Sequence, residues 1–180
     1  MNNKRGFTLI ELVIVAVVVS ILAAVLAPLA LSSLRAYDET LKDLIVLDKL
    51  RYSTERLARE IREVNWDKTN GFAFTAQTGS LAFTRSLWDS SGNLNTAVPV
   101  IICYSGSTVS LNYSSSCTGA NTLTDQFNAL SFAFYDKDGK GTAVATAIRS
   151  VQISLTLQKS STGPFYSQRT RVELKNYDNS

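Results

Sequence analysis

Few residues in this sequence have the types and spacing that chemistry requires. The chain contains no histidine, so it lacks the commonest general base and the commonest metal ligand. It has two cysteines, Cys103 and Cys117, on either side of a Ser-, Tyr- and Gly-rich stretch that is typical of a hairpin. A lone pair of cysteines in a short chain that carries an export signal indicates a disulfide.

One acidic segment resembles part of a calcium loop. Asp136-Lys137-Asp138-Gly139 has oxygen ligands at alternate positions, but a full loop needs more of them and a closing acid about twelve positions on. Lys137 and Lys140 also oppose a cation, so we predict a hairpin turn and no metal. Serine, lysine and aspartate are plentiful, which leaves a Ser–Lys hydrolase open, but no nucleophile elbow and no phosphate-binding glycine loop occurs. We predict no enzyme, no catalytic residue and no cofactor.

The most informative acid is Glu11, because it precedes a long apolar segment. Residues 12–31 carry no charge and are interrupted only by Ser20 and Pro28. About 20 apolar residues suffice to span a bilayer as a helix. A carboxylate costs about 2.5–3.5 kcal/mol at the centre of such a helix and less near its end, so it usually marks a function.

Three explanations of this N-terminus compete. A secretory signal peptide would use Val25 and Ala27 as its small residues, but Pro28 follows directly and the apolar run exceeds the usual core of about 7–15 residues. A plain signal anchor, with Lys4 and Arg5 holding its end in the cytoplasm, has no use for Glu11. The third explanation rests on a motif.

Gly-Phe-Thr-Leu-Ile-Glu at residues 6–11 resembles the class III signal of type IV pilins and type II secretion pseudopilins. The resemblance implies that a prepilin peptidase cuts after Gly6 and N-methylates Phe7, leaving residues 1–6 as a leader. The glutamate of that family falls on Glu11 and its helix-kinking proline on Pro28. The implied partners are this peptidase, other pilins or pseudopilins, an inner membrane assembly platform and the lipid bilayer.

The physical chemistry of the segment agrees with this resemblance. After cleavage, Phe7 carries a free amine and Glu11 carries the opposite charge one helical turn later. Pairing the two offsets much of the cost of burying each, and a pair between neighbouring subunits would set their axial register. Glu11 as a snorkelling acid stays an alternative. Pro28 removes one helix hydrogen bond, so we expect a kink or local melting, unless it is simply tolerated.

Residues 7–34 are thus expected to form a transmembrane and assembly helix, which continues as an amphipathic helix over residues 35–66. Opposite charges four residues apart favour a solvated helix face; the pairs are Asp38–Lys42, Glu55–Arg59, Arg56–Glu60 and Arg59–Glu63. Apolar residues at spacings of three and four predict one apolar stripe, made of Leu34, Tyr37, Leu41, Leu44, Leu47, Leu50, Leu57, Ile61 and Val64.

Residues 67–180 read as a β-rich head, which gives an α+β fold: one long helix with an antiparallel sheet packed on its C-terminal half. Trp66, Trp88, Tyr104 and Tyr113 are typical of core or edge packing, or else of a binding surface. Alternation and β-branched residues predict strands at 80–84, 98–104, 108–113, 130–135, 150–157 and 168–174.

The charge of the chain argues against a nucleic-acid partner. The formal net charge is +3, and Lys4 and Arg5 of the leader carry two positive charges, so no dense basic stretch is available to replace counterions. We expect a single-pass inner membrane protein with its head in the periplasm or outside the cell.

A second resemblance concerns the subtype. Residues 50–63, 149–155 and 169–174 are similar to segments of J-type pseudopilins and of PilW-like or MshO-like minor pilins. This implies a low-abundance subunit that initiates or caps a filament. More than sixty residues follow Cys117, which argues against a major pilin. The alternative is a membrane-tethered binding module or adhesin on the same anchor.

Overall fold

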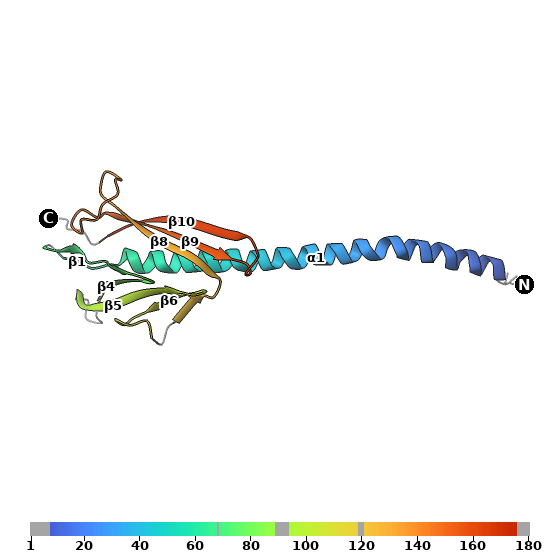
Figure 1. The fold of residues 1–180 in the computed structure, drawn as a ribbon, viewed down its shortest axis with the longest axis horizontal. Helices are drawn as coiled ribbons and strands as arrows, with labels where there is room; N and C mark the ends of the chain where they lie inside the picture. Colours follow the sequence, from blue (N-terminus) through green and yellow to red (C-terminus); the bar gives the residue numbers. More distant parts are fainter. Residues whose placement is uncertain (1–7, 68, 89–93, 119–120, 176–180) are drawn as a thin grey trace, which may run out of the picture. The chain divides into compact units, whose positions relative to one another are not determined.

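The computed structural model describes residues 8–67, 69–88, 94–118 and 121–175. Within these described residues, the helix α1 (Leu9–Arg62) precedes ten strands, which confirms the α+β fold (Figure 1). The chain divides into two compact units, residues 1–43 and residues 44–180.

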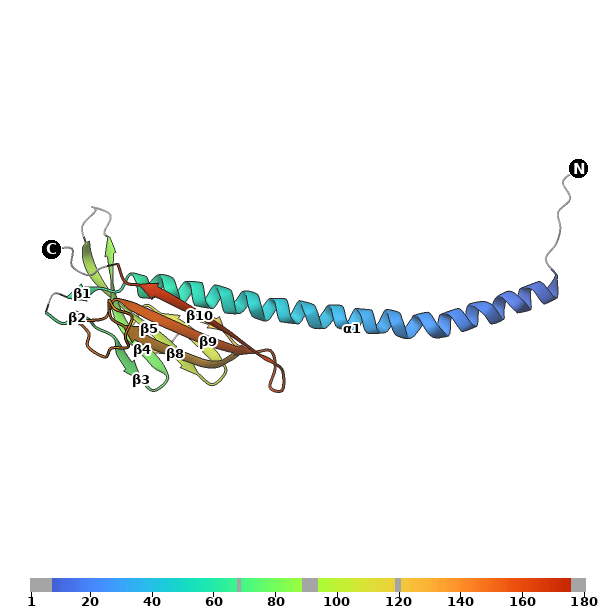
Figure 2. The ribbon, with the colours of Figure 1, turned by 90° about the horizontal axis from the view of Figure 1, so that it is seen from above.

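The first unit contains the N-terminal part of α1. Residues 8–42 are all exposed, and α1 contains an 18-residue window of mean hydropathy 3.1, long and apolar enough to cross a membrane. Pro28 lies inside this helix, which continues through it. Of the two expected effects, a kink or local melting, the structure shows the first: the ribbon bends in its blue part (Figure 2). A proline removes only one donor, and the neighbouring turns keep theirs.

The second unit, called the head, contains the end of α1 and three antiparallel sheets rather than the one that was predicted. The larger two have the strand orders β3-β4-β5-β6-β7 and β10-β9-β8, and β1 and β2 form a small ribbon. The six predicted strands are confirmed, with shifted ends, as β4 (Ser80–Trp88), β5 (Leu94–Ser105), β6 (Thr108–Asn112), β8 (Phe127–Tyr135), β9 (Ser150–Gln158) and β10 (Phe165–Glu173). Four short strands were not predicted: β1 (Trp66–Asp67), β2 (Gly71–Phe72), β3 (Thr75–Gln77) and β7 (Asn121–Thr124).

One hydrophobic core joins α1 to both larger sheets. Val46, Leu50, Leu57 and Ile61 supply the helix side of it. The predicted apolar stripe is buried from Leu50 onward. The exposed members of that stripe are Leu34, Tyr37, Leu41, Leu44 and Leu47.

Residues 136–149 connect β8 to β9, and their start is the predicted turn. One carboxylate oxygen of Asp136 accepts hydrogen bonds from the backbone N–H groups of Asp138 (2.9 Å) and Lys140 (2.8 Å). Further along, a side chain at Gly71 would begin 2.5 Å from the backbone of Ala145. This close approach requires glycine and fixes the connection against β2.

Candidate assembly segment and helix–head contacts

The described part of the predicted assembly segment begins at Thr8; Gly6 and Phe7 lie outside the described residues. The N–H of Glu11 donates to the Thr8 hydroxyl (3.4 Å), and the N–H of Thr8 donates to the Glu11 carboxylate (3.5 Å). This reciprocal arrangement is a capping box, which satisfies two of the free donors at a helix start. The Thr-x-x-Glu spacing that signals it is visible in the sequence, but sequence reasoning missed it.

Both capping contacts are long for hydrogen bonds, and Glu11 is exposed. Its carboxylate therefore keeps accepting capacity for a further donor. The apolar side chains of the described part of the first unit are exposed: Leu9 is 83% exposed and Leu31 is 56% exposed. Such a surface requires lipid or other apolar chains around it.

Residues 1–27 match the sequence model of the prokaryotic N-terminal methylation motif. The chain carries a type IV pilin-like N-terminal signal. The match includes Gly6, Phe7 and Glu11 and ends just before Pro28. No curated protein matches the sequence.

Among the described acids, Glu60 in the head is fully buried. Its side chain accepts hydrogen bonds from Arg85 (2.6 Å) and from the Tyr113 hydroxyl (2.7 Å), with Arg56 at 3.1 Å. Arg56 also donates a hydrogen bond to the Tyr113 hydroxyl. The Arg85 guanidinium carbon lies 4.9 Å from the centre of the Tyr113 ring. The prediction that Arg56 and Glu60 form a solvated pair is therefore wrong for Glu60. We call Glu60, Arg56, Arg85 and Tyr113 the Glu60 cluster.

The Glu60 cluster joins three parts of the head. Glu60 and Arg56 come from α1, Arg85 from β4, and Tyr113 directly follows β6. A buried carboxylate is costly unless its oxygens are paired. The packing of α1 in the head therefore depends on β4 and the segment after β6, which supply Arg85 and Tyr113. Burial raises the pKa of Tyr113, and its hydrogen bond to Glu60 raises it further.

A second polar contact fixes α1 near the point where its burial begins. Lys49 lies 2.7 Å from the Asp125 carboxylate, between β7 and β8. The hydrogen bond from Lys49 lowers the pKa of Asp125. Because Asp125 is exposed, this pair adds little stability to the packing of α1.

The predicted disulfide is confirmed. Cys103 of β5 is bonded to Cys117, with their Cα atoms 5.9 Å apart. Since β5 pairs with β6, the bond ties the segment after β6 back onto the sheet. Tyr113 lies within this closed loop, so the disulfide also restrains the Glu60 cluster.

Tyr104 and Trp66, two of the aromatic residues named as candidates for core packing or a binding surface, pack against other apolar side chains. Tyr104 lies 6.0 Å from Phe127 and 6.4 Å from Phe132, measured between ring centres, and Trp66 packs against the core. The side chain of Trp88 lies outside the described residues. Among the described residues, no group of three or more His, Cys, Asp or Glu side chains is arranged to hold a metal.

Proposed function

We propose that the chain is a minor pilin or pseudopilin that initiates or caps a type IV pilus or a type II secretion pseudopilus. The observation that carries this is the methylation-motif match over residues 1–27, on a chain whose next apolar turns can span a membrane. The motif belongs to structural subunits, and its processing enzyme cuts after the glycine, here Gly6.

In the proposed mechanism, cleavage on the cytoplasmic side leaves Phe7 with a new amine. That amine, on an incoming or neighbouring subunit, pairs with Glu11. The pair forms where little water competes, so it is worth more than an exposed ion pair. The pair stabilises one axial register between subunits as they leave the bilayer. Pro28 produces the bend of the helix. The head lies in the periplasm or outside the cell.

The charge of the helix supports a minor subunit over a major one. The helix is densely charged between Arg51 and Glu63, like that of J-type pseudopilins and of PilW-like or MshO-like minor pilins.

The decisive experiment replaces Glu11 in cells where the variant is the only copy. Glu11→Leu removes an acid from lipid, so insertion and cleavage after Gly6 should be unchanged or easier. Filament initiation, counted as surface filaments or secreted substrate, should be lost. Glu11→Gln should lie between, because it keeps hydrogen bonding without charge.

Thr8→Ala is the matched control. It removes the capping hydroxyl but leaves the charge of Glu11, so it separates the cap from the intersubunit pair. Assembly should survive in Thr8→Ala. Normal assembly with Glu11→Leu would contradict the pairing mechanism and leave a membrane-tethered binding module or adhesin as the better account.

The processing step has its own test. Intact mass and N-terminal sequencing of the cellular protein should find a chain that begins at Phe7 and carries one added methyl group. A mature chain that begins near Leu29, or an uncut Met1 in cells with active peptidase, is the result that excludes a pilin-like subunit.

A further inference from the structure

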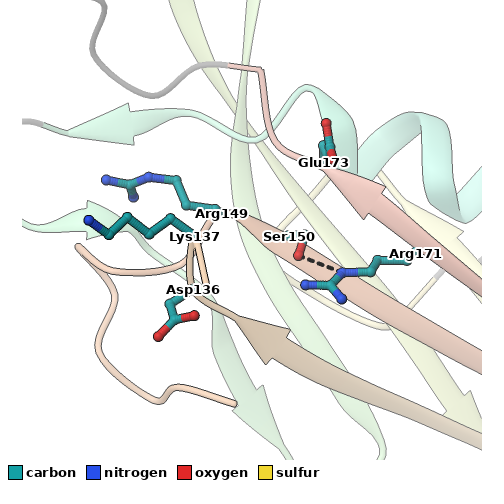
Figure 3. Close-up of a pocket in the computed structure, with 6 residues that line it drawn as sticks. All are labelled: Asp136, Lys137, Arg149, Ser150, Arg171 and Glu173. Carbon is teal, nitrogen blue, oxygen red and sulfur yellow. Dashed lines mark hydrogen bonds between the residues drawn. The ribbon is translucent and has the colours of Figure 1, made fainter. Parts of the chain in front are cut away.

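A cationic pocket lies on the head where residues 136–149 meet the three-stranded sheet. It has a volume of about 470 Å³ and is lined by Asp136, Lys137, Arg149, Ser150, Arg171 and Glu173 (Figure 3). Three of these residues are cations and two are carboxylates. Neither the predicted signal nor the Glu60 cluster uses any of them.

Arg171 is held in position before any ligand arrives. Its Nε donates to the Ser150 hydroxyl (2.8 Å), drawn as a dashed line in Figure 3, and its guanidinium carbon lies 4.4 Å from the centre of the Tyr135 ring. The two terminal nitrogens face Gly139, at 3.8 and 3.9 Å from where a side chain there would begin. A fixed guanidinium of this kind suits bidentate binding of a planar carboxylate.

The charges in the pocket favour an anion. One carboxylate oxygen of Asp136 is already used by two backbone N–H groups of the turn. Arg149 is braced by hydrogen bonds from its guanidinium to the carbonyls of Thr146 and Ile148 (both 2.8 Å). Lys137 is exposed and adds a third positive charge. The cations therefore outweigh the acids at this place.

The exposure of the pocket argues for a protein segment over a free anion. Lys137, Arg171 and Glu173 are all exposed, and an ion pair in water contributes little to binding. These cations gain strength only when a partner covers them and excludes water. A stacked arginine and tyrosine are also the residue types that dominate the energy of protein interfaces.

We propose that this pocket docks an acidic segment of a partner subunit, with a carboxylate seated against Arg171 between Lys137 and Arg149. The proposal rests on the subunit role proposed above, because that role supplies the partner. The docking joins heads to each other, whereas the Phe7–Glu11 pair joins helices.

The test uses the full-length, disulfide-bonded chain in non-ionic detergent micelles at low ionic strength. The probe is a fluorescein-labelled hexaglutamate peptide, followed by fluorescence anisotropy, with hexaglutamine as the neutral control peptide. Arg171→Gln should weaken binding of hexaglutamate by about tenfold. Arg169→Gln is the matched control, because Arg169 is an exposed arginine two residues earlier in β10 and outside the pocket lining; it should change binding by less than about twofold.

Because Arg171 also stacks on Tyr135, its variant needs a second check. Near-ultraviolet circular dichroism reports whether the head stays folded. Lys137→Gln changes an exposed side chain and should weaken binding by about threefold, so it decides the matter if Arg171→Gln unfolds.

Four outcomes would overturn the proposal: no binding of hexaglutamate, equal binding of hexaglutamine, equal losses from Arg169→Gln and Arg171→Gln, or no loss from Lys137→Gln. Displacement of the peptide by inorganic phosphate at matched charge concentration would assign the pocket to small anions and overturn it as well. None of these measurements needs cleavage or a filament, so a failure here is distinct from a failure of the proposed function.

Discussion

Removing Arg85 tests whether the Glu60 cluster holds α1 in the head. Arg85→Met leaves a fully buried carboxylate without its shortest contact, 2.6 Å. Loss of one partner of a buried pair costs about 3–5 kcal/mol. Tyr113 and Arg56 stay in place, so we expect the lower end, about 3 kcal/mol. At about 4 °C per kcal/mol for a domain of this size, the melting temperature should fall by about 12 °C.

The double variant Glu60→Leu with Arg85→Met gives the sharper result. Replacing both partners of a buried pair by apolar groups is often close to neutral, so the double variant should cost about 1 kcal/mol and melt above the single Arg85→Met variant. The measurement is thermal unfolding of the full-length chain in micelles, followed by near-ultraviolet circular dichroism of the head aromatics. A double variant that melts below Arg85→Met would refute the reasoning, because the two changes would then simply add.

A matched control is available on the same helix. Arg51 pairs with Glu55 at 2.8 Å, but their side chains are 75% and 60% exposed. Arg51→Met should therefore leave the melting temperature of the head almost unchanged. A large loss in this variant would mean that charge removal anywhere on α1 destabilises the head.

Three further predictions concern the head. Replacing Cys103 and Cys117 by serine opens a loop with a sequence separation of 14 and should cost about 3 kcal/mol, seen as a lower denaturant midpoint; an unchanged midpoint would contradict it. Tyr113→Phe should reduce the loss of stability above about pH 10, because the raised pKa of Tyr113 makes its contribution present at lower pH and lost as pH rises; an identical alkaline limb would argue against this origin. The pKa of Asp125 is lowered, so its ion pair stabilises the head above the ordinary pKa of 3.8 and this stabilisation is lost as pH falls through the lowered pKa. Lys49→Gln should therefore slightly flatten the acid side of the curve of stability against pH. An acid side of unchanged steepness would contradict this prediction.

The sequence predicted those features that depend on residues close together in the chain. The signal at residues 6–11, the length of the apolar helix, the turn at Asp136 and six strands each depend on neighbouring residues, and the structure confirms the helix, the turn and the strands. The disulfide followed from cysteine count and compartment. Short strands such as β1 and β3, of two and three residues, contain too few positions to show alternation.

The Glu60 cluster could not be predicted in the same way. Arg56 and Glu60 have the i, i+4 spacing that is typical of solvated helix faces, and Arg85 lies 25 residues further along, in a strand. Only the docking of α1 on β4 decides that Glu60 is buried. The apolar stripe shows the same dependence: Leu44 and Leu47 keep helical spacing with Leu50 yet are exposed, because periodicity does not say which turns of a helix a sheet covers.

The way α1 completes the core of the head has a mechanical consequence. The contacts between α1 and the core are spread along the helix axis, at Val46, Leu50, Leu57 and Ile61. Tension applied through the N-terminal end of α1 would therefore load these contacts in parallel, as shear. Contacts that share a load resist more than contacts that open one after another. Lys49, bonded to Asp125 at 2.7 Å, would take strain near the first of them, while Glu60 lies near the last. The head would therefore resist the withdrawal of its own helix, most strongly at the end of α1 near Glu60.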